Sequence, residues 1–222
     1  MHISERIKLL VDILPNDKLT LADIGTDHGF LPIYAVKTNK AKMVYAVDIN
    51  EGPLNSAKNN ISKHDLDSQI KIILANGLDF INEKTQIIDY VTISGLGTKT
   101  MLKIIENDNE KIKNYLFCSN TEIQGLRQWA KSNDYKIEFE SFIYENKKPY
   151  WIIMINKSFK FKKHDLELGD FNFYKNNLEY RSYLLNKFNY NNEIISKISK
   201  KSKSKKLRKS NKKIVRFIKL WN

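Results

Sequence analysis

The feature that most restricts the fold of this chain is an alternation of apolar strands and helices. Five short apolar runs of strand length follow one another at residues 19–24, 43–47, 70–74, 87–93 and 115–119. Segments of helical pattern lie between them, and another helix precedes them at residues 3–14. Near-continuous apolar strands separated by helices are typical of a parallel sheet covered on both faces. We therefore predict an α/β fold.

The predicted sheet ends in a hairpin. Residues 136–144 and 150–155 have the composition of strands, and the short segment 145–149 reads as a turn. This hairpin would add one antiparallel strand to the sheet. The sequence therefore predicts a mostly parallel seven-stranded sheet with one antiparallel strand.

The charge of the chain divides it into two segments. The 222 residues include 38 Lys and Arg against 25 Asp and Glu, a formal net charge of +13. Residues 160–222 contain 18 basic and 5 acidic side chains, whereas residues 1–159 contain 20 of each. We therefore predict a domain boundary near Phe159, with one domain at 1–159 and a basic domain at 160–222.

The basic segment shows apolar residues at helical spacing on both sides of an apolar-free stretch at residues 200–206. The first stripe includes Leu178 and Leu185, and the second includes Leu207 and Ile214. This pattern predicts an antiparallel helical hairpin or coiled coil with a turn near 200–206. A single frayed helix followed by a disordered basic tail remains the alternative.

Composition excludes several classes of protein. The single cysteine, Cys118, excludes a disulfide framework and a cysteine-rich metal site, so we expect no metal. No run reaches the roughly 18 apolar residues of a membrane span. Charged residues interrupt segment 1–15, which is therefore unlike a secretory signal. We expect a soluble, cytoplasmic protein, with a monomer favoured, and the basic charge suggests a polyanionic partner.

The turn after the first strand carries the most informative motif. Residues 23–29 read D-I-G-T-D-H-G, which differs from the G-x-G-x-x-G pattern that brings a pyrophosphate to a helix N-terminus. Asp27 would place a carboxylate where a pyrophosphate binds. A cofactor with a positive group and no phosphate, such as S-adenosylmethionine (SAM), fits this turn better. The alternative is that Asp27 caps the following helix.

Three further sites follow the next strands. Asp48 lies 23 residues after Gly25, a spacing that suits binding of ribose hydroxyls, although it could also cap the next turn. Asn76 offers an amide for an adenine edge. Residues 94–97, S-G-L-G, would permit close approach of a cofactor or base, or form a simple strand-to-helix turn.

Taken in order, the blocks A-D-I-G-T-D-H-G-F-L-P (22–32), D-I-N-E-G-P (48–53), N-G-L (76–78) and S-G-L-G (94–97) resemble the bacterial tRNA (adenine-22-N1)-methyltransferase family. The resemblance spans residues 3–157. It implies a Rossmann-like class I methyltransferase domain that uses SAM, and a C-terminal coiled-coil region. The implied reaction is methylation of N1 of an adenine in tRNA, at position 22.

The resemblance also implies roles for particular residues. The positions expected around SAM are Gly25, Thr26, Asp27, Asp48, Ile49, Asn76, Gly77, Ser94, Gly95, Leu96 and Gly97. Arg6, His28 and Asn120 are expected near the target adenine. The chain departs from the family pattern at Asn76, where aspartate is more common, and before Asn120, where a Gln-Pro pair is common.

The chemistry gives two candidate catalytic residues, Asp27 and His28. Adenine N1 has a free lone pair, so catalysis is mainly alignment, and a carboxylate can stabilise the charge that the transferred methyl leaves on the base. Asp27 could instead hold the ammonium group of SAM. Candidate phosphate contacts in the tail are Lys205, Lys206, Arg208, Lys212 and Lys213.

Two alternatives belong to other functional classes. A nicotinamide-dependent oxidoreductase could use the same topology, although Asp27 disfavours it. A non-catalytic RNA-binding protein could retain the fold without the reaction. The tail lysines could also form a merely solvated face.

Overall fold

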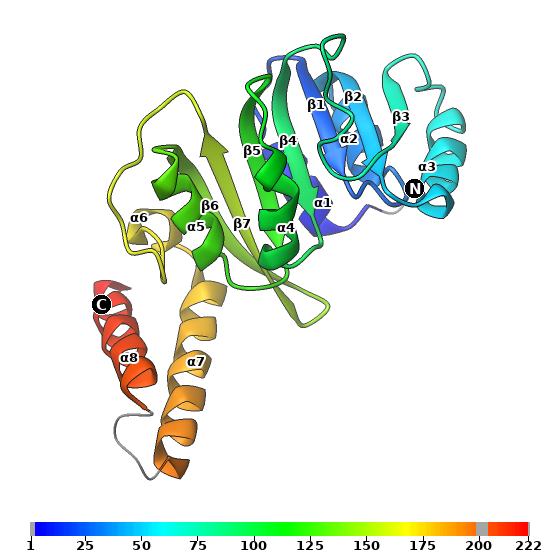
Figure 1. Ribbon diagram of the computed structural model, residues 1–222. Helices are drawn as coiled ribbons and strands as arrows, with labels where there is room; N and C mark the ends of the chain where they lie inside the picture. Colours follow the sequence, from blue (N-terminus) through cyan, green and yellow to red (C-terminus); the bar gives the residue numbers. More distant parts are fainter. Residues whose placement is uncertain (1–2, 199–203, 222) are drawn as a thin grey trace.

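The computed structural model describes residues 3–198 and 204–221. Within these residues, seven strands form one sheet in the order β3-β2-β1-β4-β5-β7-β6 (Figure 1). The strands are β1 (Leu19–Ile24), β2 (Ala41–Asp48), β3 (Ile70–Leu74), β4 (Ile88–Ser94), β5 (Ile112–Ser119), β6 (Lys136–Glu145) and β7 (Lys148–Asn156). Neighbouring strands from β1 to β5 are parallel, and β7 is antiparallel to both β5 and β6.

This sheet confirms the predicted α/β fold, with its single antiparallel strand. β1 and β3 have the predicted bounds, and the hairpin of β6 and β7 is present. β1 is buried along its whole length, because helices cover both of its faces.

The covering helices form two layers. They are α1 (Glu5–Asp12), α2 (Phe30–Lys37), α3 (Glu51–Ser62), α4 (Thr98–Ile104) with the 3₁₀ turn η1 (Ile105–Asn107), and α5 (Gln124–Ser132). One apolar cluster includes buried residues of α1, α2 and α3, among them Leu10, Ile33 and Ala57. Met101 and Leu126 place α4 and α5 in the other cluster.

The chain order of the strands reverses between β1 and β4, which lie side by side at the centre of the sheet. Helices leave the carboxyl ends of neighbouring strands in opposite directions at such a point and leave a crevice there. The segments that follow Ile24 and Ser94 therefore lie at this crevice.

Beyond β7 the chain forms α6 (Phe171–Tyr174), α7 (Leu178–Lys197), α8 (Lys205–Ile218) and the 3₁₀ turn η2 (Lys219–Trp221). α7 and α8 pack side by side as the predicted helical hairpin (Figure 1). Of the predicted turn at 200–206, residues 200–203 lie outside the described residues. No helix in the described ranges combines the length and apolar character needed to cross a membrane.

The predicted apolar stripe of α7 is wrong at two positions. Leu178 is 71% exposed and Leu185 is 43% exposed, whereas Tyr180 and Leu184 are buried. The reason is that α7 packs against both α8 and β6, so its buried face is set by two partners. The buried face also includes Asn191, whose amide donates to Asn211 of α8 at 2.8 Å.

The helical hairpin shares a core with the sheet. Tyr180 and Phe217 belong to the same apolar cluster as Phe142 and Trp151, and the Phe142 and Tyr180 rings lie 5.5 Å apart. The boundary near Phe159 lies just after β7 and stays a prediction, while the two segments on either side of it pack together.

Candidate functional site

The turn after β1 contains residues whose φ angles are positive. Gly25 has φ +74°, and a Cβ built on it would meet no atom within 4 Å, so its face is open. Asp27 also has positive φ, at +52°. Helix α2 begins at Phe30, and its N-cap residue is Gly29, without a side-chain cap. The alternative that Asp27 caps this helix is therefore wrong.

Asp48 fixes the turn from the neighbouring strand. Its carboxylate accepts hydrogen bonds from the backbone N–H of Asp27 at 3.4 Å and of Asn50 at 3.0 Å. Asp48 therefore does cap the following turn, which was one of its two predicted roles. A carboxylate has about four acceptor sites, so the contacts with these two residues leave capacity for a ligand's hydroxyl groups.

A pocket of about 330 Å³ lies at the crevice between β1 and β4. It brings together seven of the residues predicted in the turn after β1 and in the 94–97 segment, together with the predicted Arg6, and it adds Asp23. The lining residues are Arg6, Ile7, Asp23, Gly25, Thr26, Asp27, His28, Phe30, Leu31, Ser94, Gly95 and Leu96.

The two candidate catalytic residues lie at the edge of this pocket. His28 Nε2 is 3.6 Å from Asp27 Oδ1, and both side chains are at least half exposed. The His28 ring stacks on Phe30 with 5.5 Å between centroids. The carboxylate and the imidazole are thus open to an incoming substrate, and neither is used in the core.

Arg6 reaches the pocket from α1 and is held on several sides. Its Nε donates to Glu145 Oε2 at 3.1 Å, and its backbone N–H donates to Glu145 Oε1 at 3.2 Å. Its Nη1 donates to Ser94 Oγ, and its guanidinium lies 4.8 Å from the Tyr150 ring centroid. Glu145 was not predicted from the sequence, because its partner is 139 residues away.

Asp23 is a second site residue that sequence reasoning left without a role. It is buried at the floor of the pocket, and Thr92 Oγ1 donates to its Oδ1 at 2.6 Å. Burial raises the pKa of Asp23 to about 6, although the hydrogen bond from Thr92 lowers this pKa. The available signal was an acidic residue inside an otherwise apolar strand.

The remaining predicted cofactor residues lie along the same edge of the sheet, outside the pocket lining. Ile49 follows Asp48 and is 60% exposed, which is unusual for so apolar a side chain. Asn76 is exposed, and Gly77, with φ +57°, follows β3. Gly97 begins α4 as its N-cap residue.

Asn120 lies beside the 94–97 segment. Its side-chain amide donates to the Gly95 carbonyl at 3.0 Å, and its backbone N–H donates to the Leu96 carbonyl at 3.1 Å. Asn120 therefore fixes the position of the loop that lines the pocket, and its exposed side chain stays close to the site.

The predicted phosphate contacts lie on α8. Lys205, Lys206, Arg208 and Lys212 are exposed. Lys213 differs, because its Nζ lies 3.0 Å from Asp165 and 3.3 Å from Glu167. Its charge is thus neutralised by two carboxylates that attach α8 to the preceding segment.

Across residues 3–198 and 204–221, no group of three or more His, Cys, Asp or Glu side chains is arranged to hold a metal ion. The pocket carries two carboxylates, Asp23 and Asp27, and the cation that it contains, Arg6, is paired with Glu145. This charge balance suits a ligand with positive groups better than a pyrophosphate.

Comparison with known proteins places this chain in a family. The family model for tRNA (adenine(22)-N(1))-methyltransferase (TrmK) matches residues 21–219. The tRNA (adenine(22)-N(1))-methyltransferase of Bacillus subtilis is 30% identical over 157 residues, which are 69% of this chain and 65% of that relative. The matched region thus spans slightly less than two thirds of its length.

Two solved structures share this fold over nearly the whole length of the chain. TrmK of M. capricolum, in complex with S-adenosyl-homocysteine, is 42% identical, with full coverage of both chains and a TM-score of 0.95. Sp1610 of Streptococcus pneumoniae, in complex with S-adenosyl-L-methionine, shares the fold at 24% identity, with 98% of this chain and 100% of that chain covered and a TM-score of 0.85. With a family model that spans most of its length, this chain belongs to the tRNA (adenine(22)-N(1))-methyltransferase family.

Proposed function

We propose that this protein transfers a methyl group from SAM to N1 of an adenine in tRNA, at position 22. The observation that carries the proposal is the pocket at the β1–β4 crevice, where the D-I-G-T-D-H-G turn faces the Ser94–Gly97 loop. Family membership supports both the reaction and the position of the adenine. We further propose that the enzyme works in the cytoplasm.

The pocket residues fit SAM. Gly25 leaves open space at the turn, Asp48 retains acceptor capacity, and the exposed Ile49 offers an apolar surface for a base. Asn76, Gly77 and the 94–97 segment complete the cofactor site along the same sheet edge.

The chain's own residues then align the adenine. Bound SAM supplies an electrophilic methyl group, which N1 can accept without prior deprotonation because its lone pair is free. Asp27 stabilises the positive charge that develops on the base, and His28 contacts it from the same edge. Arg6 and Asn120 hold the target nucleotide from α1 and from the end of β5.

The tRNA is bound by both segments of the chain. Residues 1–159 form the catalytic domain, and residues 160–222 form the basic domain that contacts phosphates. The exposed Lys205, Lys206, Arg208 and Lys212 make these contacts, whereas Lys213 is paired with Asp165 and Glu167 and holds α8 in position. Such contacts carry affinity and little base specificity.

Mass mapping of the modified nucleotide tests the proposal. Unmodified tRNA is incubated with the protein and SAM, digested, and sequenced by mass spectrometry. We expect one methyl group on adenine 22. Methylation of another nucleotide would contradict the assigned position. Tight NAD binding without SAM binding, or tRNA binding without methyl transfer, would favour one of the two alternative functions.

The role of the tail is tested by charge removal. The variant Lys205→Gln/Lys206→Gln/Arg208→Gln/Lys212→Gln keeps the shared core with the sheet, which a deletion of 160–222 would expose. Four lost phosphate contacts should lower the slope of log Kd against log salt by about 3 to 4. An unchanged slope, with intact SAM affinity, would mean that this face of α8 is only solvated.

A further inference from the structure

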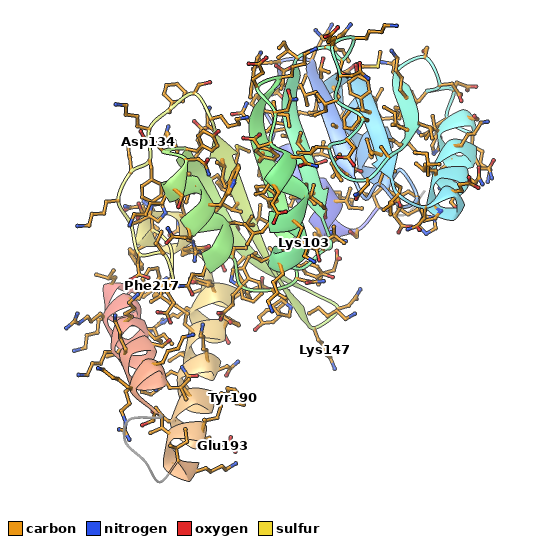
Figure 2. The ribbon with its side chains drawn as sticks, in the orientation of Figure 1. Lys103, Asp134, Lys147, Tyr190, Glu193 and Phe217 are labelled. Atoms are coloured by element: carbon orange, nitrogen blue, oxygen red, sulfur yellow. The ribbon has the colours of Figure 1, made fainter. Side chains whose placement is uncertain are left out.

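The turn between β6 and β7 carries positive charge that the structure leaves unneutralised. Residues 145–149 read E-N-K-K-P, and Asn146, Lys147 and Lys148 are exposed. Within the described ranges, neither lysine forms an ion pair, whereas Glu145 is bound by Arg6. Figure 2 shows the Lys147 side chain pointing away from the ribbon at the tip of this turn. Two cations are therefore presented to solvent by a domain whose net charge is zero.

Both ends of this turn contact Arg6, which lines the pocket. Glu145, at the end of β6, accepts two hydrogen bonds from Arg6. Tyr150, near the start of β7, lies under the Arg6 guanidinium. The position of the two lysines is thus linked to the pocket lining through Arg6.

The same turn also contacts the helical hairpin. Tyr144, just before the turn, donates its backbone N–H to Glu179 Oε2 at 3.0 Å. Glu179 lies in the first turn of α7. In Figure 1 the β6–β7 turn projects beyond the sheet on the side where α7 begins. The turn therefore contacts both a residue of the pocket lining and the first turn of α7.

We propose that Lys147 and Lys148 bind backbone phosphates of the tRNA between the nucleotide in the pocket and the part held by α8. This inference rests on the proposed function. A polyanion that occupies both the pocket and α8 can reach this turn, because the turn contacts Arg6 of the pocket lining and Glu179 of α7, the helix that packs against α8. Lysine binds phosphate as a point charge and needs no particular base. The turn thus acts as a second phosphate-binding element, on the catalytic domain itself.

The test compares the salt dependence of tRNA affinity in matched variants. Lys147→Gln/Lys148→Gln removes two contacts, so the slope of log Kd against log salt should fall by about 1.4 to 1.8. Between 50 and 200 mM salt, the wild-type affinity should then drop about tenfold more than that of the variant. SAM affinity should stay unchanged in this variant.

Two controls make the result decisive. Lys63→Gln/Lys84→Gln removes the same charge from exposed lysines at the opposite, amino edge of the sheet, and should keep the wild-type slope. Lys147→Arg/Lys148→Arg keeps the charge of the turn and should also keep the slope.

Each adverse result points to a different error. Equal slopes in the wild type and the Gln variant of the turn, in a protein that methylates tRNA, would overturn this inference alone. A slope reduced by the Arg variant as well would show that shape and not charge matters, which also overturns it. A wild-type protein that transfers no methyl group to tRNA would contradict the proposed function instead.

Discussion

The buried pair of Arg127 and Glu140 anchors the segment that leads to the basic helices. Arg127 Nε donates to Glu140 Oε1 at 2.6 Å, and Nη2 donates to Oε2 at 3.2 Å. Nη1 donates to the carbonyls of Leu166 and Glu167, and Nη2 also donates to the Tyr174 hydroxyl. Burial lowers the pKa of Arg127, but the charge of Glu140 outweighs it and holds this pKa above its usual value.

Replacing Arg127 with methionine should strongly destabilise the protein. Glu140 has no exposed surface, so the variant leaves its carboxylate buried without a partner. Removing one member of a buried ion pair costs about 3–5 kcal/mol. For a chain of this length, each kcal/mol shifts Tm by about 2–4 °C, so the variant should melt roughly 6–20 °C lower.

The double variant Arg127→Met/Glu140→Leu distinguishes the cost of an unpaired buried charge from the cost of changing side chains at these two positions. It removes both charges, and well-packed apolar replacements of a buried pair are often neutral, so most of the lost stability should return.

Urea unfolding followed by tryptophan fluorescence measures these free energies in one series. The reasoning would be refuted by a single variant that loses less than about 1 kcal/mol, or by a double variant no more stable than the single one. SAM affinity should change little, because Arg127 lies outside the pocket lining.

Three further predictions concern the pocket. Asp27→Asn should reduce methyl transfer by at least tenfold while tRNA affinity stays near the wild-type value; full activity would contradict its role. In a double-mutant cycle on kcat, Glu145→Gln should reduce turnover in the wild type but have almost no further effect after Arg6→Ala, whereas additive effects would mean that Glu145 does not act through Arg6. Without cofactor, the pKa of Asp23, about 6 and above its usual 3.8, means that the folded state binds more protons, so stability falls as pH rises from about 4 to 6. Relative to Asp23→Asn, wild-type unfolding free energies should decrease by about 2 kcal/mol over that range, and parallel pH profiles would refute the assignment.

Most of the sheet could be predicted because its strands are buried on both faces. All six residues of β1 are buried in the structure. A short, mostly apolar run of this kind between helical segments is typical of a central strand of a parallel sheet. The turn at residues 25–29 was predictable for a related reason, since Gly25 and Asp27 follow directly after β1. The sequence around β1 therefore predicts both where the crevice lies and that the Asp27 carboxylate lies beside it.

Contacts between distant segments could not be predicted in this way. Glu145 and Arg6 are 139 positions apart, and nothing around either residue indicates the other. The buried face of α7 was misplaced at Leu178 and Leu185 because periodicity reports one stripe, whereas this helix packs against two neighbours. Lys213 looks like the other lysines of α8 until Asp165 and Glu167 are placed beside it.

These ion pairs also change how the net charge of the basic segment should be understood. All five of its acidic side chains make contacts within the protein: Asp165 and Glu167 bind Lys213, Asp170 accepts from the Asn172 N–H, Glu179 accepts from the Tyr144 N–H, and Glu193 pairs with Lys197. An acid that holds α8 in place neutralises the cation that it binds and leaves the outward-facing lysines uncompensated. The outward face of α8 is therefore more positive than an even spread of the same charges would make it, because Asp165 and Glu167 lie on the side of α8 that is attached to the preceding segment.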